Sequence, residues 1–197
     1  KMISIRSIAA VGGVLVAQFV FAQAYPTAKP VTLIVPFAVG GGTDIVARLM
    51  ADKMRESLKA NVVVENKPGA SAQIGNKYVI DAAPDGYTLL VGTTSLINGA
   101  ALFPNLPYDA ARQLRPVVSL ADLPIFLSVS TQKSTAKTLR EFVDMAKKTP
   151  NLNYGSAGAG TTLHMSAEWF KTATGIQATH IPFKGSGPEV VALGGGQ

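Results

Sequence analysis

The sequence contains no cysteine and only two histidines among its 197 residues. The absence of cysteine excludes disulfide scaffolds, thiol nucleophiles and Cys-ligated zinc. Two histidines, His164 and His180, are too few for a His-rich metal site. Charged residues make up only 15% and apolar residues 47% of the chain, a balance typical of a folded domain and not of a disordered chain. We therefore expect a globular protein without a metal or another cofactor.

Positive charge is in excess but is not concentrated anywhere. The chain has 18 Lys and Arg residues against 12 Asp and Glu residues, a formal net charge of +6. A nucleic-acid-binding surface would show clustered basic residues interleaved with aromatic ones. Because the basic residues are spread along the whole chain, we expect no nucleic-acid partner.

The first 24 residues have the pattern of a secretory signal peptide. Lys1 and Arg6 give a positive start, residues 8–21 form an apolar run, and Ala22-Gln23-Ala24 provides a small-x-small cleavage pattern. The apolar run is shorter than the about 20 residues that a membrane-spanning helix needs. We predict cleavage after Ala24 and export of a mature chain that begins at Tyr25.

The first half of the mature chain alternates strand and helix patterns. Residues 31–35 and 62–64 are β-branched runs typical of strands buried on both faces, and residues 87–91 predict a third strand. Thr43 is expected to cap the helix after the first strand, and another helix is expected around residues 74–82. The apolar face expected for the helix after Thr43 comprises Ile45, Val46, Leu49, Met50 and Met54. Strands and helices in this order predict a parallel, doubly wound α/β sheet.

The pattern restarts after a proline-containing connector over residues 104–116. The expected elements are strand material over 117–129, a helix capped by Thr138 that ends near Lys148, a strand over 153–156, a helix over 163–174 and a strand over 177–181. Ser186 is expected to cap a short last helix, and the single Trp169 is expected to lie in the core. We predict two α/β lobes, over residues 25–118 and 119–197.

Each predicted lobe has a glycine- and threonine-rich loop between a strand and a helix. The first loop runs from Pro36 to Asp44 and the second from Tyr154 to Thr162. Such loops expose backbone N–H groups at a helix N-terminus, which suits an anion without any cationic side chain. One such loop by itself is equally well explained as a tight turn. Two equivalent loops at the ends of strands favour a pair of facing lobes that clamp an anion.

Rival motifs can be compared with these loops directly. Gly42-Thr43-Asp44 lacks the lysine of a Walker A loop, and Gly158-x-Gly160 lacks the third glycine of a dinucleotide fingerprint. Tyr154 stands where a nucleophile elbow around Ser156 would need glycine. Ser156 is therefore expected to be a hydroxyl donor and not a nucleophile. A secreted α/β hydrolase or transferase using Ser156 or Asp44 remains as an alternative, although no base for it is evident.

Short motifs along the mature chain also resemble a known family. They occupy residues 25–26, 30–37, 40–48, 64–70, 83–89, 106–109, 152–156 and 181–185. Together, and in this order, they resemble the extracytoplasmic substrate-binding proteins of tripartite tricarboxylate transporters, the Bug family. The resemblance implies a periplasmic binding protein with the two-lobed, type II Venus-flytrap fold. Family members continue well beyond Gly195-Gly196-Gln197, so we expect the second lobe to be incomplete and ligand binding to be weak.

The resemblance further implies a receptor and not an enzyme. It would bind a small di- or tricarboxylate, or a related organic acid, and deliver it to the membrane permease subunits of the transporter. A monomer is expected, and presentation of the ligand to a membrane sensor is a second possible role. In the family, backbone amides and bridging waters of the first loop hold the ligand carboxylate. The implied binding residues are Phe37, Gly40, Gly41, Thr43, Asp44, Gly92, Thr93, Thr94, Ser156, Gly158, Gly160, Thr161 and Thr162.

The chain departs from the family pattern at one place near the expected site. Residues 69–75 read Gly-Ala-Ser-Ala-Gln-Ile-Gly, where the family usually has Gly-Ala-Gly-Gly-Asn-Ile-Gly. Ser71 and Ala72 thus replace two glycines. We expect this change to alter the floor of the binding pocket.

Overall fold

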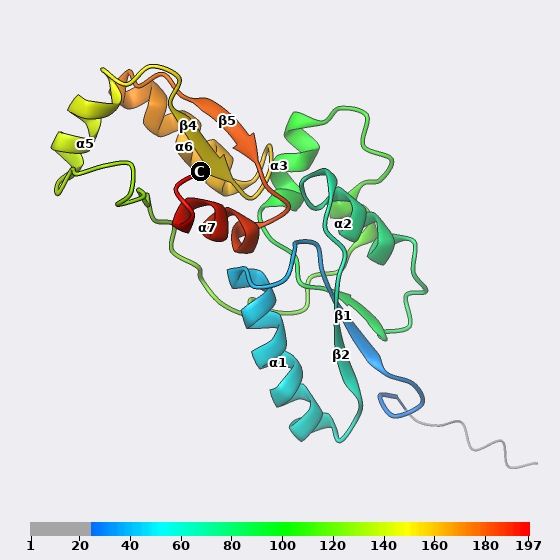
Figure 1. Cartoon of the computed structure of the whole chain (residues 1–197). Coiled ribbons are helices and arrows are strands. Elements are labelled where there is room, and N and C mark those ends of the chain that lie inside the picture. The colour runs from blue at the N-terminus through cyan, green and yellow to red at the C-terminus, as the bar shows by residue number, and fades with distance from the viewer. Residues whose placement is uncertain (1–24) are drawn as a thin grey trace, which may run out of the picture.

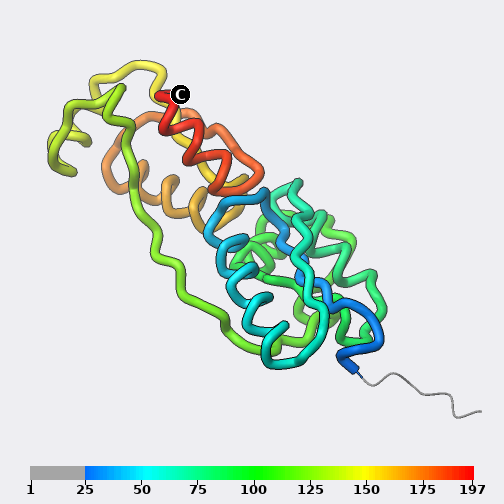
Figure 2. The backbone as a smooth tube through the Cα atoms, turned by 60° about the horizontal axis from the view of Figure 1, so that its bottom comes forward, coloured from blue at the N-terminus to red at the C-terminus, as the bar shows by residue number. Residues whose placement is uncertain are grey.

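The computed structural model describes residues 25–197, so the predicted signal peptide and its cleavage site lie outside the described residues. The described chain forms two lobes (Figure 1). A long extended connection runs between them, as the backbone trace in Figure 2 shows. The boundary at residues 118 and 119 stays a prediction.

The first lobe is built on a parallel sheet with the strand order β2-β1-β3. The central strand β1 (Val31–Val35) lies between β2 (Val62–Asn66) and β3 (Thr88–Leu90). α1 covers one face of this sheet and α2 the other (Figure 1). The core therefore centres on β1, where Ile34 is fully buried. β2 is an edge strand with Val63 37% exposed, so the expectation that it is buried on both faces is wrong.

Two helices begin after glycine and not after the hydroxyl residues expected from the sequence. α1 (Gly42–Leu58) has Gly41 as its N-cap, which places Thr43 inside the first turn. α7 (Ser186–Gly194) has Gly185 as its N-cap. Neither N-cap makes a side-chain hydrogen bond. Both expectations are wrong because a glycine backbone lets each helix start earlier than the hydroxyl residue implies.

α1 turns a different face to the sheet from the one expected. Its buried residues are Asp44, Ala47 and Ala51, whereas Ile45 and Leu49 are 53% and 63% exposed. The alanines lie three and seven positions after Asp44, and hence on its face of the helix. The polar contacts of Asp44 orient this helix, and the small alanine side chains let it approach the sheet closely.

The remaining helices of the first lobe are short. They are η1 (Ala70–Ala72), α2 (Gln73–Ile80), α3 (Ser95–Leu102) and α4 (Ala110–Gln113). α3 and α4 were not expected from the sequence. Ser71 and Ala72, which replace family glycines, both have left-handed backbones with φ of 55° and 78°. The departure from the family pattern therefore falls on positions that favour glycine.

The strand expected over residues 117–129 is not formed in the described chain. Val117, Val118 and Phe126 are 82%, 72% and 77% exposed. A strand requires a neighbour that accepts and donates its backbone hydrogen bonds, and none of the described strands lies beside this segment. The segment instead forms part of the connection between the lobes (Figure 2).

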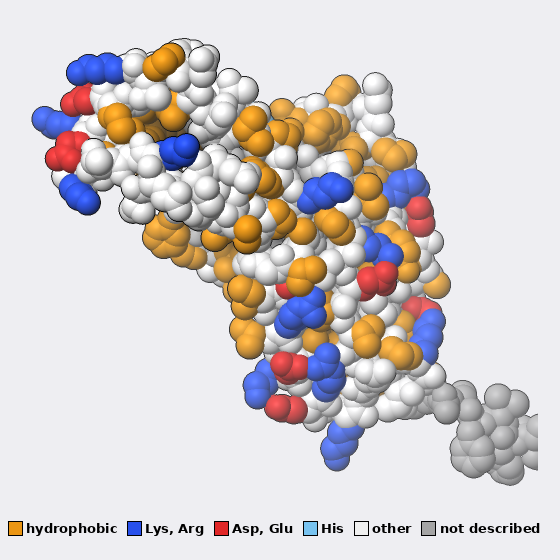
Figure 3. Space-filling view, in the orientation of Figure 1, with side chains coloured by type: hydrophobic (Ala, Val, Ile, Leu, Met, Phe, Trp, Pro, Cys, Tyr) orange, Lys and Arg blue, Asp and Glu red, His pale blue; other side chains and the backbone are white. Residues whose placement is uncertain are grey.

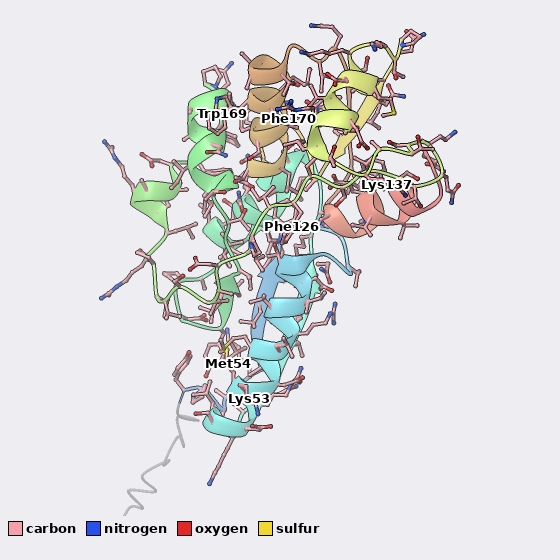
Figure 4. The ribbon with its side chains drawn as sticks, turned by 90° about the vertical axis from the view of Figure 1, so that its left-hand side faces the viewer. Lys53, Met54, Phe126, Lys137, Trp169 and Phe170 are labelled. Carbon is pink, nitrogen blue, oxygen red and sulfur yellow. The ribbon has the colours of Figure 1, made fainter. Side chains whose placement is uncertain are left out.

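The second lobe has two parallel strands, β4 (Asn153–Ser156) and β5 (Thr179–Pro182). Its helices are α5 (Leu139–Ala146), α6 (Thr162–Thr174) and α7. Trp169 on α6 is 78% exposed, so the expectation of a core tryptophan is wrong. Figure 4 shows the helix α6 with Trp169 and Phe170, the extended segment with Phe126, and Met54 on α1. No described element covers Trp169, because the second sheet is small.

Candidate functional site

The first glycine loop is held in place by the carboxylate of Asp44. This side chain is buried, and its oxygens accept four hydrogen bonds. The Gly40 amide donates to Oδ2 at 3.0 Å, and the Nδ2 of Asn66 donates to Oδ1 at 2.9 Å. Arg48 donates twice, from Nε at 3.0 Å and from Nη2 at 2.9 Å. The carboxylate is thus fully used in fixing the loop.

The ionisation of Asp44 follows from these contacts. Burial is the largest single influence and acts to raise the pKa, but hydrogen bonds from Arg48, Gly40 and Asn66 together outweigh it. The pKa of Asp44 therefore lies below its ordinary value. Asp44 is a fixed anion beneath the loop, where it orients donors and neutralises Arg48. The geometry makes it a positioning residue and not a direct partner for a bound anion.

The second glycine loop is organised around Ser156. Its hydroxyl is fully buried, accepts a hydrogen bond from the Gly158 amide at 3.1 Å and lies 2.7 Å from Nε2 of His180. The Gly160 amide donates to Nδ1 of His164 at 3.2 Å. The two loops share this last arrangement, because in each a glycine amide donates to a side chain four residues later, at the start of a helix.

A cluster of rings and charges supports the second loop. The rings of His164 and His180 lie 4.2 Å apart, and Tyr154 stacks on His180 at 5.0 Å. The Tyr154 hydroxyl donates to Glu168, which also pairs with Lys171 at 2.9 Å. Burial, aided by the proximity of His164, lowers the pKa of His180. The cluster therefore favours an uncharged His180 next to Ser156.

We expect His180 to titrate below 6.5, the ordinary histidine value. A histidine whose pKa is lowered by folding contributes stability that is lost as the pH falls from the unfolded value through the folded value. The second loop should therefore lose stability in mildly acidic solution. NMR titration of the two histidine ring resonances measures this, with a His164→Gln variant to assign them. A His180 pKa at or above 6.5 would contradict the structural account.

Eight of the thirteen predicted binding residues line one large hollow. They are Phe37, Gly41, Thr43, Gly92, Thr93, Thr94, Thr161 and Thr162. The hollow has a volume of about 3760 Å³, well above the about 300–1,000 Å³ of a small-molecule pocket. It is an open concave surface, and the predicted residues occupy only one part of it.

The other five predicted residues make the supporting hydrogen bonds of the loops. They are Gly40, Asp44, Ser156, Gly158 and Gly160. The amides of all three glycines donate to side chains of their own lobes, so they are not available to a ligand. Other donors lie in the first turns of α1 and α6, where N–H groups have no acceptor within the helix. The His164 amide is not among them, because it donates to the Thr161 hydroxyl.

Each loop contacts the opposite lobe at the joint between the lobes. The hydroxyls of Thr94 and Thr162 form a hydrogen bond from one lobe to the other. The Ala38 amide donates to the Lys184 carbonyl at 2.7 Å, and Ala157 packs into the core of the first lobe. The lobes are therefore closed against each other at the predicted site.

On the face shown in Figure 3, charged side chains are spread over α5, over the right-hand part of the first lobe and over the far end of α1. The Arg48 guanidinium is engaged by Asp44 and Asn66. Within residues 25–197, no group of three His, Asp or Glu side chains is placed to hold a metal ion. An anion at this joint would be held by amides and hydroxyls.

Arg48 and Asn66 were missed as supporting residues, whereas the strand residue His180 was expected to be structural and is one. Arg48 follows Asp44 by four positions, a spacing typical of helical ion pairs, so it could have been found. Asn66 and His180 reach the loops from neighbouring strands. Their roles become visible only when the strand register is known.

The geometry can now be compared with known proteins. A family model described as "Tripartite tricarboxylate transporter family receptor" matches residues 46–197. The chain belongs to this family. The family predicted from the short motifs is thereby confirmed. Among residues 25–197, no helix is both long enough and apolar enough to span a bilayer.

Relatives and solved structures agree with this assignment. Protein BugT of Bordetella pertussis is 39% identical over 184 residues, which cover 92% of this chain and 56% of BugT. The structure "R. palustris Rpa4515 with adipate" has 35% identity and a TM-score of 0.81, covering 86% of this chain and 57% of that one. "MatC (Rpa3494) from Rhodopseudomonas palustris with bound malate" has 35% identity and a TM-score of 0.74, covering 84% and 57%. The predicted α/β binding-protein fold is confirmed, and the chain spans little more than half of each relative.

Proposed function

We propose that this chain is part of a periplasmic solute receptor that binds a small carboxylate for a tripartite tricarboxylate transporter. Its partners would be the permease subunits of that transporter and, in a second role, a membrane sensor to which it presents the ligand. The family and the adipate and malate in related structures support this proposal. The observation that carries it is the hydrogen bond between Thr94, the N-cap residue of α3, and Thr162, the first residue of α6, which joins the two lobes inside the shared hollow.

The proposed carboxylate position lies between the first turns of α1 and α6. The amides of Thr43 and Thr162 lie in these first turns, where helix dipoles favour an anion. Thr94, the N-cap residue of α3, bonds directly to Thr162, and both threonines line the same hollow as Thr43. A carboxylate oxygen would replace that bond by accepting from both hydroxyls. The five supporting residues described above would hold the loops in shape without touching the ligand.

The hydrolase alternative is not favoured by the geometry. Ser156 and His180 are close enough for a nucleophile and a base. However, Ser156 is 0% exposed and its hydroxyl is engaged with Gly158. A substrate carbonyl cannot reach a buried hydroxyl. The family is a receptor family, which points to binding without turnover.

Thermal unfolding of the chain with added carboxylates tests the proposed function. Adipate, malate and citrate should raise the melting temperature, whereas uncharged adipamide should not. Binding is expected to be weak. At a ligand concentration of about ten times Kd, the native state gains about 1.4 kcal/mol, which raises the melting temperature by about 3–6 °C. A cooperative melt with no shift for any of the three acids would contradict the proposal.

Two threonine variants locate the site in the same assay. Thr94→Val and Thr162→Val keep the side-chain shape but remove the hydroxyls, and each should reduce the shift caused by adipate. Thr172→Val, on the same helix as Thr162, is the matched control because its exposed hydroxyl donates only to the Glu168 carbonyl. Equal shifts in all three variants would place the ligand elsewhere.

A further inference from the structure

The start of α7 lies directly on the backbone of the first glycine loop, beside the beginning of α1 (Figure 1). A Cβ atom added to Gly187 would lie 2.5 Å from the Val39 carbonyl oxygen and 3.1 Å from the Gly41 nitrogen. Backbone atoms cannot move aside as the end of a side chain can. The close approach of the two lobes here therefore requires that residue 187 has no side chain.

The requirement for glycine does not arise from the conformation of Gly187 itself. Gly187 is absent from the glycines with left-handed backbones, whereas Gly185 has a φ of 136°. Gly187 lies in the first turn of α7, where alanine is accommodated and has the higher helix propensity. Within its own helix, alanine would thus be preferred. What excludes it is the contact with the other lobe.

We propose that Gly187 is a positioning residue for ligand capture. Because it has no side chain, α7 can pack directly against the Gly40–Gly41 backbone. This contact lets the second lobe close over the first turn of α1. The effect of Gly187 on ligand binding rests on the proposed function. The contact between α7 and the first loop does not depend on that function, and it can be measured without a ligand.

Displacement of α7 would be transmitted to the second glycine loop. α7 packs on β4, where a Cβ atom added to Gly155 would lie 3.1 Å from Cγ of Glu189. The residue after Gly155 is Ser156, the buried centre of the second loop. If α7 is held away from the first loop, β4 and the second loop retreat with it. The hydroxyl of Thr162 then leaves Thr94.

Gly187→Ala tests the proposal, with Gly194→Ala as the matched control. Both glycines lie in α7, and a Cβ atom on Gly194 would meet nothing within 4 Å. The readout is hydrogen exchange of the Ala38 amide, whose acceptor is the Lys184 carbonyl of the other lobe. Gly187→Ala should speed this exchange about tenfold and weaken adipate binding about tenfold, without lowering the melting temperature of the unliganded chain. Gly194→Ala should leave both unchanged.

A second pair of variants distinguishes loss of the contact between α7 and the first loop from a general loss of stability. A Cβ atom on Gly41 would lie 2.8 Å from the Ser186 hydroxyl oxygen, and its next neighbour is the Gly187 nitrogen at 3.4 Å. Gly41→Ala should therefore speed exchange of the Ala38 amide, and adding Ser186→Ala should restore it. Ser186→Ala should not rescue Gly187→Ala, which meets backbone atoms.

Three outcomes are decisive. Wild-type exchange of the Ala38 amide and wild-type adipate affinity in Gly187→Ala would overturn the proposal. Faster exchange in a chain that binds no carboxylate even as wild type would support the closing contact and refute the proposed function. Faster exchange with unchanged adipate affinity would refute the role of Gly187 in capture.

Discussion

Replacing Asp44 with alanine should lower the free energy of unfolding by about 3 kcal/mol. The variant removes the acceptor of the Gly40 amide, one of the two acceptors of the Asn66 Nδ2 group, and the carboxylate that pairs with Arg48. Among the described residues, Arg48 then keeps only its bond to Asn66. Arg48 is half exposed, so water compensates in part and the loss falls at the lower end of the range for a broken buried pair. Urea denaturation followed by far-UV circular dichroism measures it.

Asp52→Ala is the control for this prediction. Asp52 lies on the same helix and pairs with Arg55 on the surface, with both side chains well exposed. Its removal should cost no more than about 1 kcal/mol. The difference between wild type and Asp44→Ala should persist above 3.8, the ordinary aspartate pKa, and shrink as the pH falls below it. Equal losses in the two variants would show that Asp44 does not hold the first loop.

Ser156→Ala should destabilise the chain by about 2 kcal/mol. The hydroxyl is the partner of both the Gly158 amide and the His180 ring, in a place that water does not reach. Without it, two polar groups remain unpaired inside the second loop, and each unpaired buried group costs about 1–3 kcal/mol. Urea denaturation measures the loss.

Ser130→Ala serves as the comparison for the second loop. The Ser130 hydroxyl accepts one long hydrogen bond from the Gln132 amide, at 3.4 Å, in an exposed turn. Its loss should change the stability by no more than about 0.5 kcal/mol. If the two serine variants behaved alike, the second loop would not depend on Ser156, and the parallel with Asp44 in the first loop would fail.

Local features of the chain were predictable where they depend on neighbouring residues. The strand over residues 31–35 follows from its β-branched run, and the cap of α5 by Thr138 follows from the spacing to Glu141. The end of α6 at Gly175 follows in the same way, because glycine readily takes the left-handed backbone found there. These signals lie within a few positions of the element they define.

The failures involve residues whose surroundings come from elsewhere in the chain. Residues 117–129 have the composition of a strand, and Trp169 has the character of a core residue. Both are exposed, because no described element packs beside them. Burial is a property of what lies opposite a side chain, and a single sequence does not state this.

The sequence by itself determined the fold class, the family and the two glycine loops, since these depend on periodicity and on short motifs. Only the tertiary structure decided which groups of the loops remain available to a ligand. The amides of Gly40, Gly158 and Gly160 are consumed inside the protein, and the Thr161 hydroxyl takes up the His164 amide in the first turn of α6. The partners that lock the loops, Asn66 and His180, arrive through parallel strand pairing over long stretches of chain. Hydrogen bonds formed across such distances follow from the register of the sheets and not from local sequence.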